Sequence, residues 1–150
     1  MSPSEDIQLA NAQIQDMVGR DFSEFRMGFG LRLDFGDDWL VTIETPFSMS
    51  GDVELFGGEP VSGEAAAALL PLRLRRVSSA QVQPDGTLTI GMEDGVLSVP
   101  AHPLYESWQV AGPRGVLVVC PPSASYIAVW ADDGQSGSHG FRYGSADSEA

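Results

Sequence analysis

Apolar and polar residues alternate with a period of two over most of the chain, which is the pattern of half-buried β-strands. Residues 31–35 and 39–43 are two such runs, and the acidic turn Gly36-Asp37-Asp38 between them predicts a β-hairpin. The same pattern returns at 88–92 and 97–99, on either side of Glu93-Asp94-Gly95. Further strands are expected at 47–55, 72–82, 107–111, 116–120 and 126–131. Strands at this spacing, separated by proline and glycine turns, predict an all-β meander, sandwich or barrel.

Two segments have helical rather than strand character. In residues 4–18, Ser4 is a suitable N-cap, and Ile7, Ala10 and Ile14 follow at helical spacing. Residues 62–70 are rich in alanine and end before Pro71. A helix this short is not stable alone in water, so we expect it to pack on a sheet.

The two acidic hairpins indicate a possible internal duplication, because residues 31–40 line up with residues 88–97. Chance similarity between two hairpins is the alternative. We expect a mainly β fold of two antiparallel meanders that form a sandwich or a partly open barrel, and we favour the barrel-like form. The expected organisation is a helical segment at 1–18, a β domain at 19–131 (related halves 19–55 and 72–131, linked by the helix 62–70) and a tail at 132–150. The tail is expected to be disordered, because it has too little apolar surface to bury.

Composition and charge narrow the classes of partner. The chain has 150 residues, 21 acidic and 8 basic, and a net charge of -13. This balance argues against nucleic acid and anionic membrane as partners, since both require a cationic surface. All eight basic residues are arginine, which excludes every lysine-based chemistry. The N-terminal segment carries acids where a signal peptide needs a basic start, so we expect a cytoplasmic location.

The residues that usually carry catalysis are few. His139 lies in the predicted tail, and His102 lies between two strands without a marked nucleophile. Cys120 ends an apolar run, where cysteine is usually an inert core residue. Two separate histidines and one cysteine do not form a structural zinc site. We therefore expect no catalytic residue, no metal and no cofactor.

One basic cluster interrupts the acidic sequence, formed by Arg73, Arg75 and Arg76. In the expected strand, Arg73 and Arg75 share one face. The cluster is interpreted either as a contact for an anion or partner, or as charges that pair within the molecule and protect an edge strand.

The acids at the two hairpin tips are the candidate partner-binding residues, Asp37, Asp38, Glu93 and Asp94. Trp39 follows the first tip and is expected to be exposed, as an interface anchor. A strong negative field speeds association with a cationic protein. The leading hypothesis is a non-enzymatic binding domain, and more specifically an immunity-type inhibitor of a basic toxin or nuclease. A small-ligand-binding β-barrel, an enzyme that uses carboxylates or His102, and a self-associating structural subunit are the alternatives.

Several short motifs are similar to those of a known family. YESWQV at 105–110, GPRG at 112–115 and IAVW at 127–130 resemble the C-terminal signature of an uncharacterised family of small, mainly β actinobacterial proteins. GLRL at 30–33 and IETPF at 43–47 resemble its N-terminal hairpin. The resemblance covers about residues 18–131 and implies no established activity and no catalytic residue. It also implies an occasional neighbourhood with secreted toxin systems, which agrees with a small acidic domain.

Overall fold

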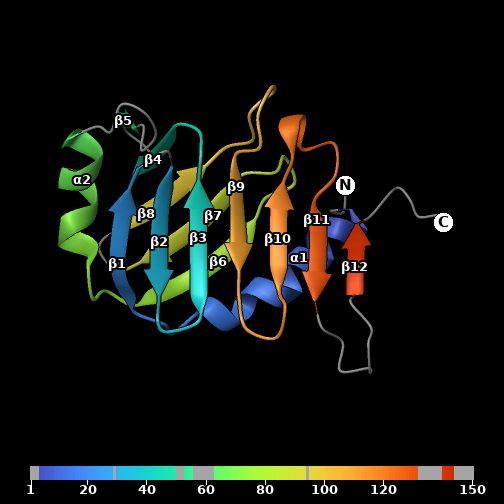
Figure 1. Cartoon of the computed structure of the whole chain (residues 1–150), viewed down its shortest axis with the longest axis horizontal. Coiled ribbons are helices and arrows are strands. Elements are labelled where there is room, and N and C mark those ends of the chain that lie inside the picture. The colour runs from blue at the N-terminus through green and yellow to red at the C-terminus, as the bar shows by residue number, and fades with distance from the viewer. Residues whose placement is uncertain are drawn as a thin grey trace.

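Two antiparallel sheets form the molecule (Figure 1). The computed structural model describes residues 4–28, 30–49, 53–55, 63–93, 95–131 and 140–143. Within them, a seven-stranded sheet contains, in spatial order, β1 (Phe22–Met27), β2 (Leu31–Phe35), β3 (Trp39–Ile43), β9 (Trp108–Ala111), β10 (Leu117–Cys120), β11 (Ala128–Ala131) and β12 (Gly140–Tyr143). A five-stranded sheet contains β5 (Val53–Leu55), β4 (Phe47–Met49), β8 (Gly95–Val99), β7 (Leu88–Met92) and β6 (Val77–Val82).

The helices are short. α1 (Glu5–Ile14) continues into the 3-10 turn η1 (Gln15–Met17), and α2 (Gly63–Leu69) continues into η2 (Leu70–Leu72). A third 3-10 turn, η3 (Pro122–Ala124), links β10 to β11. Among the described residues, no helix has both the length and the apolar composition needed to span a membrane.

One apolar core lies between the two layers. The inward positions of β2 and β3 are fully buried, whereas Arg32 on the other face of β2 is exposed. This alternation is expected for a sheet with one face against the core. In Figure 1 the five-stranded sheet lies behind the β1–β3 half of the large sheet, and α1 lies behind its other half. α1 contacts β6, β11 and β12, so helix and small sheet together cover the inner face.

Polar side chains of α1 complete the hydrogen bonding of β6, the edge strand of the small sheet. Asn11 Nδ2 donates to the carbonyl oxygen of Val82 at 3.1 Å, and the Val82 N–H donates to Asn11 Oδ1 at 2.6 Å. Gln15 Nε2 donates to the carbonyl oxygen of Ala80 at 3.0 Å. Unpaired backbone groups on an edge strand invite pairing with other chains. The helix therefore both fills the core and protects this edge.

The structure confirms the expected class, a mainly β fold with two antiparallel sheets and two short helices. Both sheets are open, so the barrel-like form that we favoured is not observed. Among the described residues, an isolated bridge between Asp21 and Arg76 joins the start of β1 to the start of β6. The sheets thus meet at this corner without closing into a barrel.

Three expectations about individual segments need correction. The expected strand 72–82 begins only at Val77, because η2 and a turn at Leu74 precede it. The expected strand 47–55 is divided into β4 and β5. In the expected disordered tail, Gly140–Tyr143 forms β12 and pairs with β11, so the prediction is wrong for these four residues. Residues 132–139 and 144–150 lie outside the described residues, as does Ser62, the first residue of the expected helix 62–70.

The alignment between the two hairpins holds for their first strands only. Leu31 and Leu88 are both fully buried, as the alignment requires. In the second strands, buried Trp39 is aligned with Val96, which is 44% exposed. The β2–β3 turn has one residue more than the β7–β8 turn, since Phe35 pairs with Trp39 but Met92 pairs with Gly95. One extra residue moves every later side chain to the opposite face.

Candidate functional site

A hollow of about 490 Å3 lies on the outer face of the large sheet, at the turn between β2 and β3. Strands β1, β2, β3 and β9 all contribute to it. Its lining residues are Ser23, Glu24, Arg26, Asp34, Gly36, Asp37, Asp38, Trp39, Leu40, Ala111 and Gly112. The first predicted acidic tip is therefore part of a concave site.

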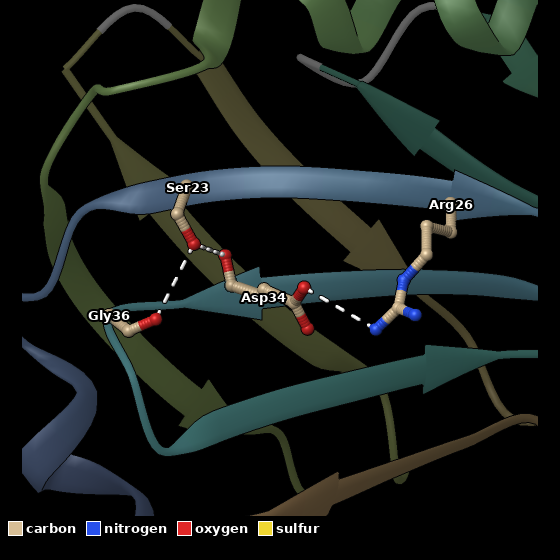
Figure 2. Close-up of polar contacts among 4 residues, drawn as sticks. All are labelled: Ser23, Arg26, Asp34 and Gly36. Carbon is tan, nitrogen blue, oxygen red and sulfur yellow. Dashed lines mark hydrogen bonds and ion pairs between the residues drawn. The ribbon is translucent and has the colours of Figure 1, made fainter.

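A β-bulge in β1 shapes this site. The pairing of β1 with β2 shifts between Phe22 and Glu24, so Ser23 is the additional residue of the bulge. The Ser23 hydroxyl donates to the carbonyl oxygen of Asp34 at 3.0 Å and lies 3.4 Å from that of Gly36 (Figure 2). It thereby ties β1 to the end of β2 where the acidic turn begins.

The turn itself depends on Gly36. This residue has φ +65°, in the left-handed region that glycine occupies without steric cost. Its N–H donates to the carbonyl oxygen of Asp21 at 2.8 Å. With Gly36 fixed, the next two residues, Asp37 and Asp38, are both exposed at the rim of the hollow.

The charge of the hollow is strongly negative. Four carboxylates, Glu24, Asp34, Asp37 and Asp38, line it together with one guanidinium, Arg26. Arg26 Nη2 lies 3.6 Å from Asp34 Oδ2, and the Arg26 side chain is 61% exposed (Figure 2). Such exposed pairs contribute at most about 1 kcal/mol. Within the described part of the chain, Asp37 and Asp38 form no ion pair, and the Arg73 guanidinium borders the hollow where it donates to the Ser23 carbonyl oxygen.

The expectation that Trp39 is exposed is wrong, because its side chain is only 3% exposed. Trp39 lies directly opposite Phe35, and residues paired in this way share a face of the sheet. Because Phe35 points into the core, so does Trp39. Its ring also packs closely under Gly112, where a Cβ atom would lie 2.5 Å from Trp39 Cζ3. The indole is a core residue beneath the site and not a surface anchor.

The second predicted tip belongs to the other sheet. Glu93 is exposed between β7 and β8, and it does not line the hollow. Asp94 lies outside the described residues. The structure therefore groups Asp37 and Asp38 with Glu24 and Asp34, two acids on neighbouring strands that sequence analysis did not select. Their alternation with apolar residues was visible, but their proximity depends on the register of β1 and β2.

A second hollow, of about 480 Å3, lies on the same strands towards their other end. Arg26, Arg32 and Glu44 provide its charged groups, and Met27, Gly28, Gly30 and Thr42 complete its lining. Two guanidinium groups against one carboxylate reverse the sign of the charge. The negative potential on this face is thus concentrated at the end that bears the β2–β3 turn.

The other residues considered for catalysis are His102, Cys120 and His139. His102 Nδ1 accepts the Leu104 N–H at 3.0 Å, and its ring centre lies 5.0 Å from that of Tyr105. Cys120 is fully buried, and this burial raises the pKa of its thiol. His139 lies outside the described residues. Among the described residues, no three His, Cys, Asp or Glu side chains are grouped closely enough to hold a metal ion.

The arginine cluster makes contacts within the molecule. Arg76 Nε lies 3.7 Å from Asp21 Oδ1, and Arg73 Nε donates to the carbonyl oxygen of Ser23 at 3.3 Å. Arg73 and Arg75 do not share a strand face, because this segment precedes β6. These contacts agree with the interpretation that the charges pair within the molecule.

The model of a family of unknown function, DUF6188, matches residues 13–131. The chain belongs to DUF6188. The DUF6188 region extends from α1 to the end of β11 and contains every residue that lines the acidic hollow. No curated protein and no solved structure matches the chain.

Proposed function

We propose that this chain is a non-enzymatic, cytoplasmic protein-binding domain that recognises a basic protein through the acidic hollow. The observation that carries the proposal is the convergence of Glu24, Asp34, Asp37 and Asp38 on one concave site with a single guanidinium. Carboxylates accept two parallel hydrogen bonds from an arginine side chain, which gives both strength and orientation. A volume of about 490 Å3 accommodates such a side chain.

The net charge of -13 adds a kinetic argument. A negative field at a concave surface concentrates cationic partners and raises the association rate by about 10- to 1000-fold. The effect decreases with ionic strength, because salt screens exposed charges. Recognition through the hollow is therefore expected to be fast and sensitive to salt.

The finer proposal is an immunity-type inhibitor of a basic toxin or nuclease. A nuclease binds the phosphate backbone through arginine and lysine side chains. An acidic domain that occupies those side chains competes with the substrate and needs no catalytic groups of its own. The hollow offers four carboxylates for this competition.

The alternatives fit the observed geometry less well. A ligand carrier was expected to hold its pocket inside a barrel, whereas the two described hollows lie on the outer face of an open sheet. A structural subunit that self-associates is distinguished by its mass in solution. An enzyme centred on His102 has less support, because in the described part of the chain its imidazole contacts the Leu104 N–H and the Tyr105 ring, and neither contact supplies a carboxylate or a serine hydroxyl.

The test is affinity capture from the native host at low salt, with three immobilised forms of the full chain. Wild type is compared with D37N/D38N and with the control E5Q/D16N, which removes the same charge from exposed positions on α1 and η1. A basic protein that wild type and the control retain, and D37N/D38N loses, is then purified. Its affinity is expected to fall at least about tenfold in D37N/D38N and to decrease with salt.

Two results would overturn the proposal. One is a specific partner that is acidic or neutral and binds independently of salt. The other is a basic partner whose affinity is the same for D37N/D38N as for E5Q/D16N, which would show that overall charge and not the hollow governs binding.

A further inference from the structure

One line of side chains crosses the outer face of the large sheet at the level of the acidic hollow. In each antiparallel pair the residues lie directly opposite one another, and such residues share a face. The line runs from β1 to β11 through Glu24, Asp34, Leu40, Ala111, Leu117 and Trp130. Val119 and Ala128 lie opposite each other in the next row of the same face.

The line changes character along its length. Its first two residues are acidic and line the hollow, whereas the remaining four are apolar. We call Leu40, Ala111, Leu117, Val119 and Trp130 the apolar ladder. Each of these side chains is half-buried, although residues on the inner side of the same strands, such as Val110 and Val118, are fully buried.

Within the described part of the chain, neither the two α-helices nor the five-stranded sheet lies over the outer face that carries the ladder. Figure 1 shows α1 and the five-stranded sheet behind the large sheet, with α2 beyond its β1 edge. A solvent-facing sheet face is normally polar, as Arg32 and Asp34 make it on β2. Apolar residues that continue across four strands of such a face indicate a surface for another protein.

The hollow and the ladder form one continuous surface, because Leu40 and Ala111 belong to both. We propose that the ladder is the second half of the partner interface. The occupant is a basic protein whose arginine or lysine side chains enter the hollow while neighbouring apolar side chains cover Leu117, Val119 and Trp130. This inference rests on the proposed function and adds the apolar character of the partner surface.

Charge decides between this occupant and a second copy of the chain. Every copy carries a net charge of -13 and the same acidic hollow at one end of the ladder. Bringing two such faces together places like charges near each other and is opposed by repulsion. A cationic partner gains from the same charges.

The dimensions also suit a protein partner. Glu24 on β1 and Trp130 on β11 are five strand-to-strand steps apart, which at about 4.8 Å per step gives a width of about 24 Å. A standard interface buries about 800 Å2 on each partner, a patch about 28 Å across. Such interfaces have an apolar centre and a polar rim, and this face has the same arrangement.

Two synthetic peptides separate the two halves of the surface. One is hexa-arginine, and the other alternates arginine with leucine and contains the same six arginines. We expect the alternating peptide to bind wild type at least about tenfold more tightly, since burial of two leucine side chains supplies this difference. In L117S/W130S the alternating peptide is expected to lose most of this advantage, whereas hexa-arginine binding is unchanged.

The control V96S replaces an exposed valine on β8, away from this face, and is expected to keep the tenfold ratio. Near-ultraviolet circular dichroism establishes that each variant is folded. If the double variant is unstable, the single variant W130S replaces it, and the ratio of the two peptide affinities is then expected to fall by a smaller amount. The inference is overturned if L117S/W130S keeps the wild-type ratio. It is also overturned if wild type sediments as a dimer that L117S/W130S converts to a monomer.

The same titrations distinguish failure of the inference from failure of the proposed function. D37N/D38N is expected to weaken the binding of both peptides and to leave their ratio above one. If hexa-arginine binds D37N/D38N as well as wild type, the acidic hollow is not the cation site and the proposed function fails. If the ratio of the two affinities is the same in L117S/W130S as in wild type, only the inference about the ladder is rejected and the proposed function is not.

Discussion

Leu117 lies directly opposite Trp130 on strands β10 and β11, and both side chains are half-buried on the outer face of the large sheet. The other two tryptophans have core positions, with Trp39 3% exposed and Trp108 0% exposed. The indole of Trp130 is therefore the most accessible to solvent of the three, and its fluorescence reports directly on the proposed ladder.

This difference predicts the outcome of acrylamide quenching. Wild type should contain one readily quenched component of tryptophan fluorescence, and W130F should lose it, because the quencher does not enter a close-packed core. W39F is the control and should retain the component. Loss of the quenched component in W39F instead of W130F would contradict the assignment of the exposed indole.

An added methyl group at Gly86 should be strongly destabilising. Gly86 has φ +90°, and a Cβ atom there would lie 2.5 Å from the Ala124 Cβ. Its carbonyl oxygen also accepts the Trp108 indole N–H at 3.0 Å. Backbone strain and overpacking together should lower the free energy of unfolding of G86A by about 2–4 kcal/mol, measured by urea denaturation.

The matched control for this prediction is G28A. Gly28 has no atom within 4 Å of its Cβ position and no positive φ, so the same substitution meets no obstacle. G28A should be at least as stable as wild type. Unfolding of G86A and G28A at the same urea concentration would contradict tight packing around Gly86.

Asp6 fastens α1 to the large sheet. Its carboxylate is 2% exposed and accepts the Ile7 N–H at 2.9 Å and the Ile127 N–H at 2.6 Å, together with the Ser4 hydroxyl. Removing it leaves buried N–H groups unpaired, so D6A should lose about 2–4 kcal/mol of unfolding free energy. E5A alters the adjacent exposed acid and should change stability little; an equal loss in E5A would show that only helix charge matters.

Glu106 should make stability decrease with rising pH. Partial burial, and secondly the Glu44 charge, raise the pKa of Glu106 above its ordinary value of 4.5. The folded protein then binds this proton more tightly than the unfolded chain. As pH rises from about 4.5 through the folded pKa, the folded state loses this advantage, and its stability falls.

The variant E106Q removes this titration and should be more stable than wild type at neutral pH, with the difference shrinking towards about pH 4. E44Q lowers the pKa of Glu106 towards its ordinary value and should give a smaller change of the same sign. Thermal unfolding across this range measures both. A constant difference between E106Q and wild type at all pH values would contradict the raised pKa.

The strands are the part of the fold that the sequence predicts best. The period-two runs at 31–35 and 39–43 correspond to β2 and β3, because one face of each strand lies against the core. The sequence pattern does not predict turns that depend on an unusual backbone conformation. Leu74 has φ 71°, a left-handed conformation that no propensity predicts for leucine, and the turn there delays the start of β6.

The candidate site was predicted only in part. Asp37 and Asp38 were recognisable as acids in a turn, and they do line the hollow. Their neighbours Glu24 and Asp34 depend on strand register and on the bulge at Ser23, which are long-range properties. The prediction that Trp39 is exposed was wrong because it also depends on strand register. The length of the preceding turn decides on which face of the sheet the Trp39 side chain lies.

The central claim is that the acidic hollow, and not the charge of the whole chain, recognises cations. Amide chemical shifts recorded during titration with hexa-arginine at low salt test it most directly. We expect the largest shifts at residues 34–40 and around Ser23, and we expect them to disappear in D37N/D38N but to persist in E5Q/D16N. Shifts spread evenly over all exposed acids, including Glu5, Asp16 and Asp85, would contradict it.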